Sequence, residues 1–366
     1  MIIALRELRR NPRRFVTATV VLALLVVLLL FLGGLLDGLY LGSTGTLRAQ
    51  RADVIVYSSD ANDSIIRSRI DPELRALVER VPGVTDVSGL GITLVGTTVP
   101  RRKELVDTAV VGYERAPHGV PAPPAAGEAW ADRRLAAFGV RTGQVLGVGP
   151  QQIPVTVRGW VNDTNYLLQG ALWVEPSTWR RVQETSRPDA RVANGTFQVL
   201  AVNGTEPAGR LARSIDAATH GKTTTLTKSD AVLSSPGTRE QKSTFAGIID
   251  VTFLVVALVV ALFFVLLTIE RTALYGVLKA IGAPTSRLAV GLLVQAVVIG
   301  IVAFAVGELV TLALAKLIPA QVPLALQPSR AITTFVGIVL AAAVGGLVSL
   351  RRIARTDPIT AIGAAS

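Results

Sequence analysis

Reactive and metal-binding side chains are scarce in this 366-residue sequence. It has no cysteine, a single methionine and two histidines, His118 and His220, which lie far apart. Without cysteine there are no disulfides or thiolate metal sites, and two isolated histidines lack the clustered spacing of a zinc site. A P-loop is also missing, because Asp216 stands where the fragment Gly221-Lys222-Thr223 would need its first glycine. The sequence therefore predicts no catalytic constellation, metal or cofactor in this chain.

Charged residues are few as well, and apolar ones are concentrated in long runs. Half of the residues are apolar, 17% are charged and the mean hydropathy is +0.49. Soluble helices keep a polar stripe, whereas four segments here are apolar on every face over most of their length and reach the roughly 20 residues that cross a bilayer. These predicted membrane spans, with the lipid bilayer as their solvent, are residues 15–36, 251–269, 288–317 and 331–350.

Basic residues indicate which side of the membrane each connecting segment faces. Residues 1–14 carry five arginines against one glutamate, whereas the long stretch 37–250 is nearly neutral. The loop 270–287 and the tail 351–366 each carry three basic residues against one acidic residue. Because basic loops stay inside, we predict a multi-pass protein of the cell (inner or cytoplasmic) membrane, with both termini and this loop cytoplasmic and 318–330 a short outer loop. The same clusters attract lipid headgroups and account for the pI of 10.6, so no nucleic-acid partner is expected.

Residues 37–250 have the composition of a soluble domain and enough length for a core of their own. A loop rich in proline and glycine, 117–127, predicts a seam between two lobes. The fold class predicted is membrane α-helical, with four transmembrane helices and an α+β extracytoplasmic domain inserted between helices one and two. Strands are predicted at 52–57, 88–95, 105–112, 143–147, 153–160 and 198–202, helices from Asp71 and at 131–138 and 210–218, and a polar run at 223–233.

The cytoplasmic loop 270–287 has the pattern of a short amphipathic helix. Its apolar residues Leu274, Val277, Leu278 and Ile281 fall at helical spacing, and Gly282 ends the pattern. Such a helix needs an apolar surface to meet. That surface is either a partner protein or the lipid interface, and the pattern alone leaves both open.

This loop resembles that of a known family, the FtsX-like or MacB-like permeases of ABC transporters. The family pattern has Arg, then Gly, a variable residue, Leu, a basic residue, Ala, Ile or Leu, Gly and Ala, which matches Arg271 and residues 276–283 here. Tyr275 departs from it, since an acidic residue is common there. Further similar segments are a Pro-Gly-Val turn within 81–87, a hairpin within 135–160 with Gln144 in place of aspartate, and an Asp-Pro tail within 354–362.

The resemblance implies that two copies of a separate cytoplasmic ABC ATPase, which bind ATP and Mg, dock on this loop in a dimer with a second copy of this chain. The chain itself would then be no enzyme. In size it is similar to the DevC-type and heme-exporter permease branch. The residues implied to contact the ATPase are Arg271, Leu274, Tyr275, Gly276, Leu278, Lys279 and Gly282.

Ionisable residues at the outer ends of the spans are the candidate substrate residues. A charge in hydrocarbon is costly and usually faces a protein interior or a cavity. Asp37 and Tyr40 follow the first span, Asp250 precedes the second, and Glu308 lies within the third. Asp37 and Asp250 also fit a simple marking of the water boundary. We expect Glu308 to line an outer-leaflet substrate pocket or a dimer seam.

Together these features favour the permease of an exporter that works by mechanotransmission. ATP-driven closure of the ATPases would move the helices as levers, and an amphiphilic substrate, with heme as one candidate, would leave from the membrane or the exterior space. The alternative is an FtsX-like regulatory protein, in which the same levers activate an exterior partner such as a cell-wall hydrolase.

Overall fold

The computed structural model describes residues 12–188, 192–235, 237–270, 284–319 and 322–354. They form two compact units: Leu39–Gln241, called the exterior unit after its predicted location, and a helical unit of the residues up to Gly38 and from Lys242 onward. One unbroken helix, α2 (Pro12–Arg48), contributes residues to both units.

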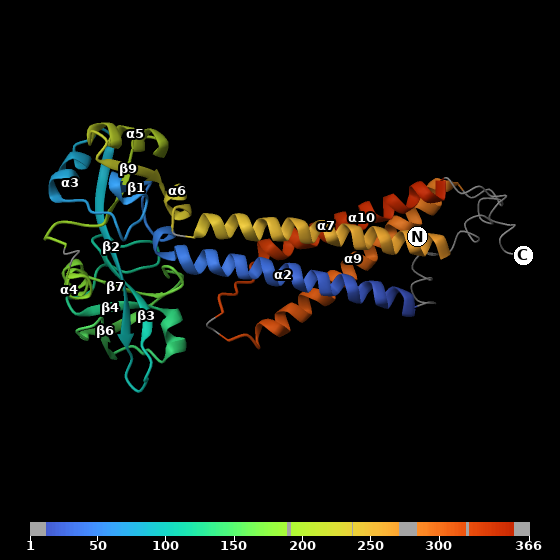
Figure 1. Cartoon of the computed structure of the whole chain (residues 1–366), viewed down its shortest axis with the longest axis horizontal. Coiled ribbons are helices and arrows are strands. Elements are labelled where there is room, and N and C mark those ends of the chain that lie inside the picture. The colour runs from blue at the N-terminus through green and yellow to red at the C-terminus, as the bar shows by residue number, and fades with distance from the viewer. Residues whose placement is uncertain (1–11, 189–191, 236, 271–283, 320–321, 355–366) are drawn as a thin grey trace, which may run out of the picture. The chain divides into compact units, whose positions relative to one another are not determined.

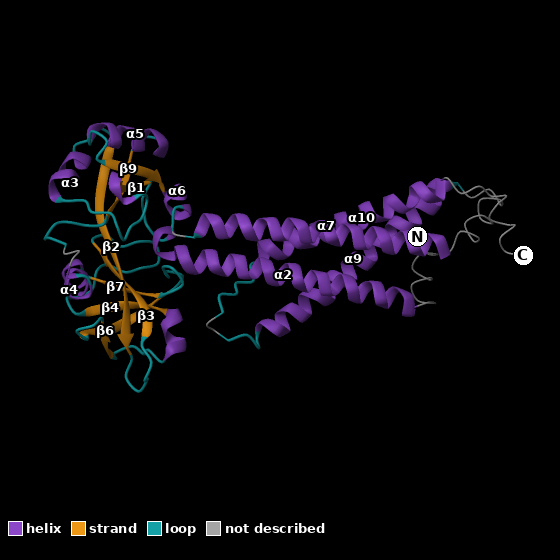
Figure 2. Ribbon diagram, viewed as in Figure 1, coloured by secondary structure: helices purple, strands orange, loops and turns teal. Residues whose placement is uncertain are grey.

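The exterior unit is built on one nine-stranded sheet in the order β3-β7-β4-β6-β5-β2-β8-β1-β9 (Figures 1 and 2). The long strand β2 holds the sheet together, because it pairs with β3, with β5 and with β8 along different parts of its length. The strands are β1 (Val54–Ser58), β2 (Val84–Thr98), β3 (Val106–Tyr113), β4 (Glu128–Asp132), β5 (Val145–Val148), β6 (Ile153–Val161), β7 (Gly170–Val174), β8 (Val199–Gly204) and β9 (Thr223–Thr227).

Short helices accompany this sheet: α3 (Pro72–Glu79), α4 (Pro176–Ser186), α5 (Ala208–Ala218), α6 (Lys228–Leu233) and the 3-10 helices η1 (Ser59–Ala61) and η2 (Arg133–Phe138). The start of α3 follows directly from the sequence. The Asp71 carboxylate accepts a hydrogen bond from the Leu74 amide at 2.7 Å, and Pro72 occupies the first turn, where its missing N–H costs nothing. An α+β domain inserted between the first two long helices is thus present as predicted.

Three of the predictions for this unit need correction or addition. We expected a helix over 131–138, but Ala131 and Asp132 belong to β4, where Ala131 is fully buried and pairs with both β6 and β7. Only Arg133–Phe138 is helical, and Gly139 ends it at φ +88°. The sequence prediction missed β7 and α4. It also left 223–233 as a polar run, where the structure has β9 and α6.

The loop 117–127, predicted as a seam between two lobes, connects two strands of the same sheet. This loop connects β3 to β4, and in the sheet these two strands are separated only by β7. The two ends of the sheet instead share β2, which is continuous from Val84 to Thr98.

Aromatic side chains pack on glycines in the centre of this unit. Trp179 of α4 is fully buried over Gly91 of β2 and Gly112 of β3, and its indole N–H donates to Thr93 Oγ1 at 2.9 Å. Phe197 stacks on Trp179 with ring centroids 6.1 Å apart and covers Gly89. The glycines therefore form a flat surface that lets α4 approach the sheet.

The helical unit consists of most of α2 together with α7 (Thr238–Glu270), α9 (Thr285–Ala315) and α10 (Pro328–Ala354). The predicted spans 15–36, 251–269 and 331–350 fall within α2, α7 and α10, whereas the predicted span 288–317 continues two residues beyond the end of α9 at Ala315. Two stretches of the described chain, Val16–Arg48 and Leu293–Ala315, are long and apolar enough to cross a membrane by length and composition. The described apolar parts of the others, Ser243–Val259 and Pro328–Val344, are shorter.

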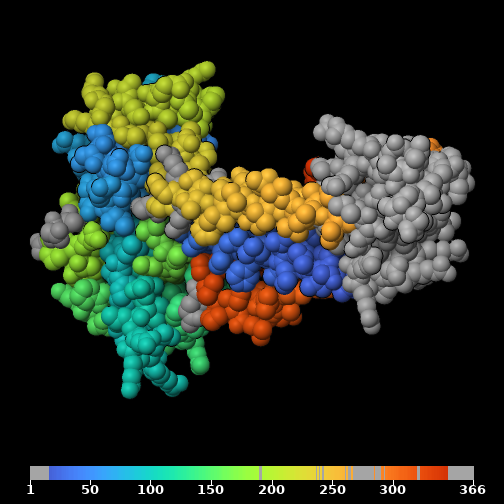
Figure 3. Space-filling view, turned by 45° about the vertical axis from the view of Figure 1, so that its right-hand side comes forward, coloured from blue at the N-terminus to red at the C-terminus, as the bar shows by residue number. Residues whose placement is uncertain are grey.

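Small residues bring these helices together. Gly300 of α9 lies against Ala342 of α10, and Gly307 lies against Val26 of α2. Gly337 of α10 is covered by the ring of Phe253 on α7. These three small residues therefore pack within this chain. In the space-filling view α7 also runs along α2 (Figure 3).

We predict that Gly91→Ala destabilises the protein by about 1 to 3 kcal/mol, because a methyl group there would overlap the Trp179 ring in a packed core. Unfolding of the detergent-solubilised chain, followed by tryptophan fluorescence, measures this. Gly209→Ala is the matched control, since nothing lies near a Cβ at that position at the start of α5. Equal stability of the two variants would contradict the packing described for Gly91.

Candidate functional site

A cavity of about 440 Å³ lies within the helical unit, where α9 ends and α10 begins. By the charge asymmetry above, this is the end predicted to face outside. Most of its lining is apolar, and Phe304 and Phe335 contact each other in it edge to face with centroids 5.1 Å apart. The polar lining residues are Glu308, Thr311, Gln327 and Arg330.

Arg330, at the start of α10, is held in place by Asp37 of α2. Its Nη2 lies 2.6 Å from Asp37 Oδ1 and its Nε lies 3.1 Å from Oδ2, which is a two-pronged ion pair. The two side chains are only 28% and 20% exposed. The stem of Arg330 lies over Gly33, where a Cβ would be 2.7 Å from its Cδ. Asp37 therefore has a defined partner and does more than mark a water boundary.

The segment leading into α10 is fastened to α2 by main-chain contacts. The Ala325 amide donates to the carbonyl of Gly34 at 2.9 Å, and the Pro323 carbonyl lies directly against Gly38. Any side chain at Gly38 would collide with that carbonyl. The glycines of α2 thus allow residues 322–327 to lie on the helix and close one side of the cavity.

Glu308 is the acidic residue of this cavity. It sits on α9 and is half-buried, and no other side chain in the described part of the chain bonds or pairs with its carboxylate. Thr311, one turn on, uses its own hydroxyl to bond the Gly307 carbonyl at 2.8 Å. The cavity therefore combines an apolar surface, a neutralised arginine and one free carboxylate. Such a combination suits an amphiphile with a positive or metal-bearing polar group.

The other two candidate residues lie elsewhere. Asp250 is exposed on α7. Tyr40 belongs to the exterior unit, where it packs against the core and lies 5.9 Å from the Arg48 guanidinium. Of the four candidate residues, Glu308 lines the cavity and Asp37 is the partner of the lining residue Arg330, whereas Tyr40 and Asp250 are not among the lining residues.

The predicted ATPase-contacting residues lie outside the described residues. These are Arg271, Leu274, Tyr275, Gly276, Leu278, Lys279 and Gly282.

Arg330 is the residue that the sequence reasoning missed. It was included in the short outer loop, with no partner assigned, and it lies 293 positions from Asp37. The cluster of Gly33, Gly34 and Gly38 within an apolar helix was a usable signal, because glycine is unfavourable inside a helix unless something packs closely there.

The last turns of α2 are fixed inside the exterior unit. The Thr46 amide donates to the Asn165 carbonyl at 3.0 Å, and the amides of Leu167 and Leu168 donate to the carbonyls of Ser43 and Gly42. Around this contact, Arg48 pairs with Asp163 at 2.7 Å and Thr46 Oγ1 donates to the Thr164 carbonyl. Lys228 Nζ donates to the Gln50 carbonyl at 2.6 Å, and burial lowers the pKa of this lysine.

Among the described residues no cluster of three or more histidine, cysteine or acidic side chains could hold a metal ion. Gly221, of the partial P-loop motif, is in the turn between α5 and β9 at φ +74°. Asp216, at the first-glycine position, instead accepts bonds from the hydroxyls of Thr223 and Thr225. These hydrogen bonds stabilise the turn between α5 and β9.

Comparison with known proteins places the C-terminal part of the chain in a family. Residues 247–358 match the family model described as FtsX-like permease C-terminal. Over 111 residues the chain is 31% identical to the hemin transport system permease protein HrtB of Staphylococcus epidermidis, covering 30% of this chain and 32% of HrtB. Over 112 residues it is 38% identical to an uncharacterized ABC transporter permease of Mycobacterium tuberculosis, covering 30% of this chain and 31% of that protein.

This segment of the chain is thus an FtsX-like permease C-terminal domain. The aligned portion spans about a third of the length of the curated relatives. Two solved structures overlay on part of the chain with TM-scores of 0.33: the extracellular domain of the ABC-type transporter YknZ from Gram-positive bacteria and the periplasmic region of MacB from Actinobacillus actinomycetemcomitans. Their sequence identities are 14% and 10%, and they cover 48% and 50% of this chain and 99% and 92% of those chains.

We predict that Arg330→Gln lowers the stability of the helical unit by about 1.5 to 3 kcal/mol, because it leaves the half-buried Asp37 carboxylate unpaired. Adding Asp37→Asn should restore part of the loss, since no unpaired charge remains. Thermal unfolding in detergent micelles measures both variants. A double variant no more stable than Arg330→Gln would show that the two residues do not act as a pair.

Proposed function

We propose that this chain is the permease subunit of an ABC-type exporter. The observation that carries the proposal is the match of residues 247–358 to the FtsX-like permease C-terminal family. Relatives that match over 111 and 112 residues include a hemin transport system permease protein and an uncharacterized ABC transporter permease. ATP hydrolysis would belong to a separate ATPase, which agrees with the incomplete P-loop in this sequence.

In this proposal the four helices α2, α7, α9 and α10 cross the membrane, and both termini are cytoplasmic. Two copies of the chain form a dimer, and each binds one ATPase through the loop 270–287. The exterior unit faces away from the cytoplasm, and so does the cavity that Glu308 and Arg330 line. The positions of the basic clusters support this orientation.

The substrate proposed is an amphiphile that enters the cavity from the outer part of the membrane. Phe304, Phe335 and the other apolar lining residues would hold its apolar part, and Glu308 would bind its positive or metal-bearing group. Heme is one such molecule, and the name of the HrtB relative refers to hemin. An axial ligand from this cavity would have to be the Glu308 carboxylate, since no histidine, cysteine, methionine or tyrosine is among the described residues that line it.

The transmission step proposed uses α2. Closure of the ATPases would shift the helices, and the last turns of α2 are hydrogen-bonded into the exterior unit. A shift of this helix would therefore be passed on to the exterior unit. The substrate would be displaced without passing through a channel from the cytosol.

The second candidate is an FtsX-like regulator of an exterior enzyme such as a cell-wall hydrolase. The same connection of α2 to a folded exterior unit favours it, because a lever that moves this unit could act on a bound partner as readily as on a substrate. Substrate-stimulated ATPase activity supports the exporter, whereas a hydrolase activated by the complex supports the regulator.

We predict that Leu278→Asp uncouples the chain from its ATPase. An unpaired carboxylate against an apolar groove costs several kcal/mol, which corresponds to a loss of binding of roughly a hundredfold or more. Co-purification of the ATPase with the full-length chain measures this. Full stoichiometric recovery of the ATPase would show instead that the loop lies in the lipid interface.

We predict that Glu308→Ala lowers export roughly tenfold or more, through loss of a charge-assisted contact to the substrate, while ATPase docking and folding are retained. Glu308→Gln keeps hydrogen bonding and removes the charge, so it separates the two contributions. Asp250→Asn is the matched control on the exposed face of α7. Wild-type export and substrate-stimulated ATPase activity in both Glu308 variants would remove this residue from the transport path.

A further inference from the structure

A second cavity, of about 640 Å³, lies entirely within the exterior unit, at the tip of the β2–β3 hairpin. Its volume falls in the range of about 300 to 1,000 Å³ that is typical of ligand sites. The sheet builds it, because the end of β2 pairs with β5 at Thr97 and Thr98. That pairing brings the hairpin turn 99–105 beside the turn 139–144, which precedes β5.

Three arginines converge on this cavity: Arg101 and Arg102 from the hairpin turn and Arg141 from the other turn. No aspartate or glutamate is among the described residues that line it. The side chains of Arg101 and Arg141 have no partner in the described part of the chain. Arg102 pairs only with Glu104, at 3.2 Å, and that carboxylate is 82% exposed, so the pair contributes little. The site is therefore cationic and available.

The geometry of Arg102 shows that the site is more than a surface charge cluster. Its guanidinium lies 5.4 Å from the centroid of the Phe138 ring, which orients it by a cation–π contact. Its Nε is buried without a hydrogen-bond partner in the described part of the chain. Both turns contain left-handed backbone positions, with Arg101 at φ +69° and Gly139 and Gly143 at positive φ. The Arg141 amide also donates to Gln144 Oε1 at 2.9 Å.

We propose that this cavity binds an acidic peptide segment of a partner protein. Arginine is the residue that matches carboxylates in a two-pronged geometry, and three of them fit several acidic side chains. Pro100, Ala137 and Phe138 provide apolar contact between the charges. A ligand that alternates acidic and apolar side chains satisfies both parts of the lining, whereas a phosphate polymer leaves the apolar part unused. This proposal does not depend on whether the chain is an exporter or a regulator.

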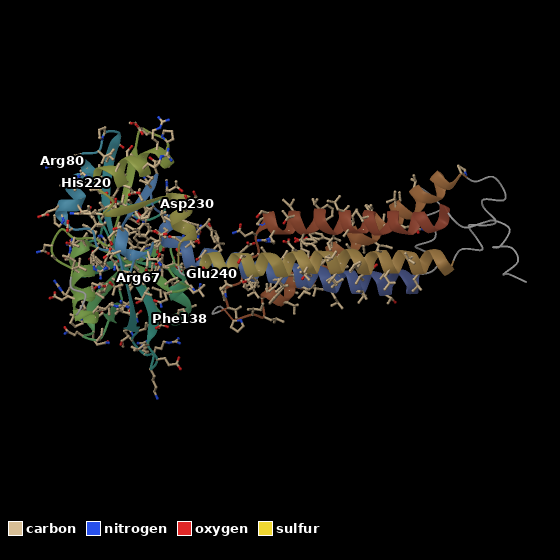
Figure 4. All side chains as sticks on the ribbon, turned by 45° about the horizontal axis from the view of Figure 1, so that its top comes forward. Arg67, Arg80, Phe138, His220, Asp230 and Glu240 are labelled. Carbon is tan, nitrogen blue, oxygen red and sulfur yellow. The ribbon has the colours of Figure 1, made fainter. Side chains whose placement is uncertain are left out.

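The test uses the full-length chain in lipid nanodiscs and a fluorescein-labelled peptide of alternating glutamate and leucine residues, with fluorescence anisotropy as the readout. Arg101→Glu combined with Arg141→Glu should weaken binding roughly tenfold or more. Arg80→Glu is the control, because this exposed arginine ends α3 at the opposite end of the exterior unit from Phe138 (Figure 4). All variants are first compared by thermal unfolding, and both pocket arginines are exposed, so their folding should be unchanged.

Phe138→Ala supplies the second measurement. A peptide that uses the apolar lining should lose more affinity in this variant than long-chain inorganic polyphosphate, which is affected only through the orientation of Arg102. The proposal is overturned if the wild-type chain shows no saturable peptide binding or if Arg80→Glu weakens binding as much as the double variant. It is equally overturned if polyphosphate displaces the peptide and binds more tightly, because the cavity would then be a phosphate-polymer site.

Discussion

The contact between the last turns of α2 and the loop 163–168 is the constraint on which the other features depend. It is made mainly by main-chain groups, with the Thr46 amide bonded to Asn165 and the Gly42 carbonyl bonded to Leu168. Main-chain bonds of this kind need close approach, which Gly45 permits because a Cβ there would lie 2.7 Å from the Asp163 carbonyl oxygen. The last turns of α2 therefore cannot rotate within the exterior unit without breaking these bonds, and they belong to a helix that is unbroken from Pro12 to Arg48. A membrane helix ending in a flexible linker would lack this property.

The helical unit contains both an ion pair that stabilises its structure and a carboxylate that has no ion-pair partner among the described residues. Asp37 and Arg330 neutralise each other, and their contact draws the start of α10 onto the glycine-lined face of α2. Glu308 lines the same cavity as Arg330, and among the described residues its carboxylate has no such partner. An ionisable group near hydrocarbon is retained at a cost in stability. The difference in partners distinguishes Glu308 from Asp37, although both are acids near the end predicted to face outside, and it is the reason that the substrate contact is proposed for Glu308 alone.

Local signals predicted much of this architecture, and contacts between distant residues explain what they missed. Asp71 and Pro72 predicted the start of α3 correctly, because helix capping depends only on neighbouring residues. Ala131 was expected in a helix, since alanine favours helices, but burial between two strands decides its conformation. Likewise, charge identified Asp37 and Glu308 from the sequence alone. It could not identify Arg330 as the partner of Asp37, because no spacing rule connects residues on the first and last helices.

The register of the exterior sheet has an evolutionary consequence. Val54, at the start of β1, is paired directly with Thr227, at the end of β9, and opposed residues in an antiparallel pair lie about 5 Å apart. The chain therefore enters and leaves the sheet at adjacent points, as an insertion into a helical hairpin requires. A domain with neighbouring ends can be exchanged, enlarged or shortened by recombination without altering the separation of the helices that flank it. Proteins of this architecture can thus acquire new exterior specificities while an unchanged membrane portion is inherited.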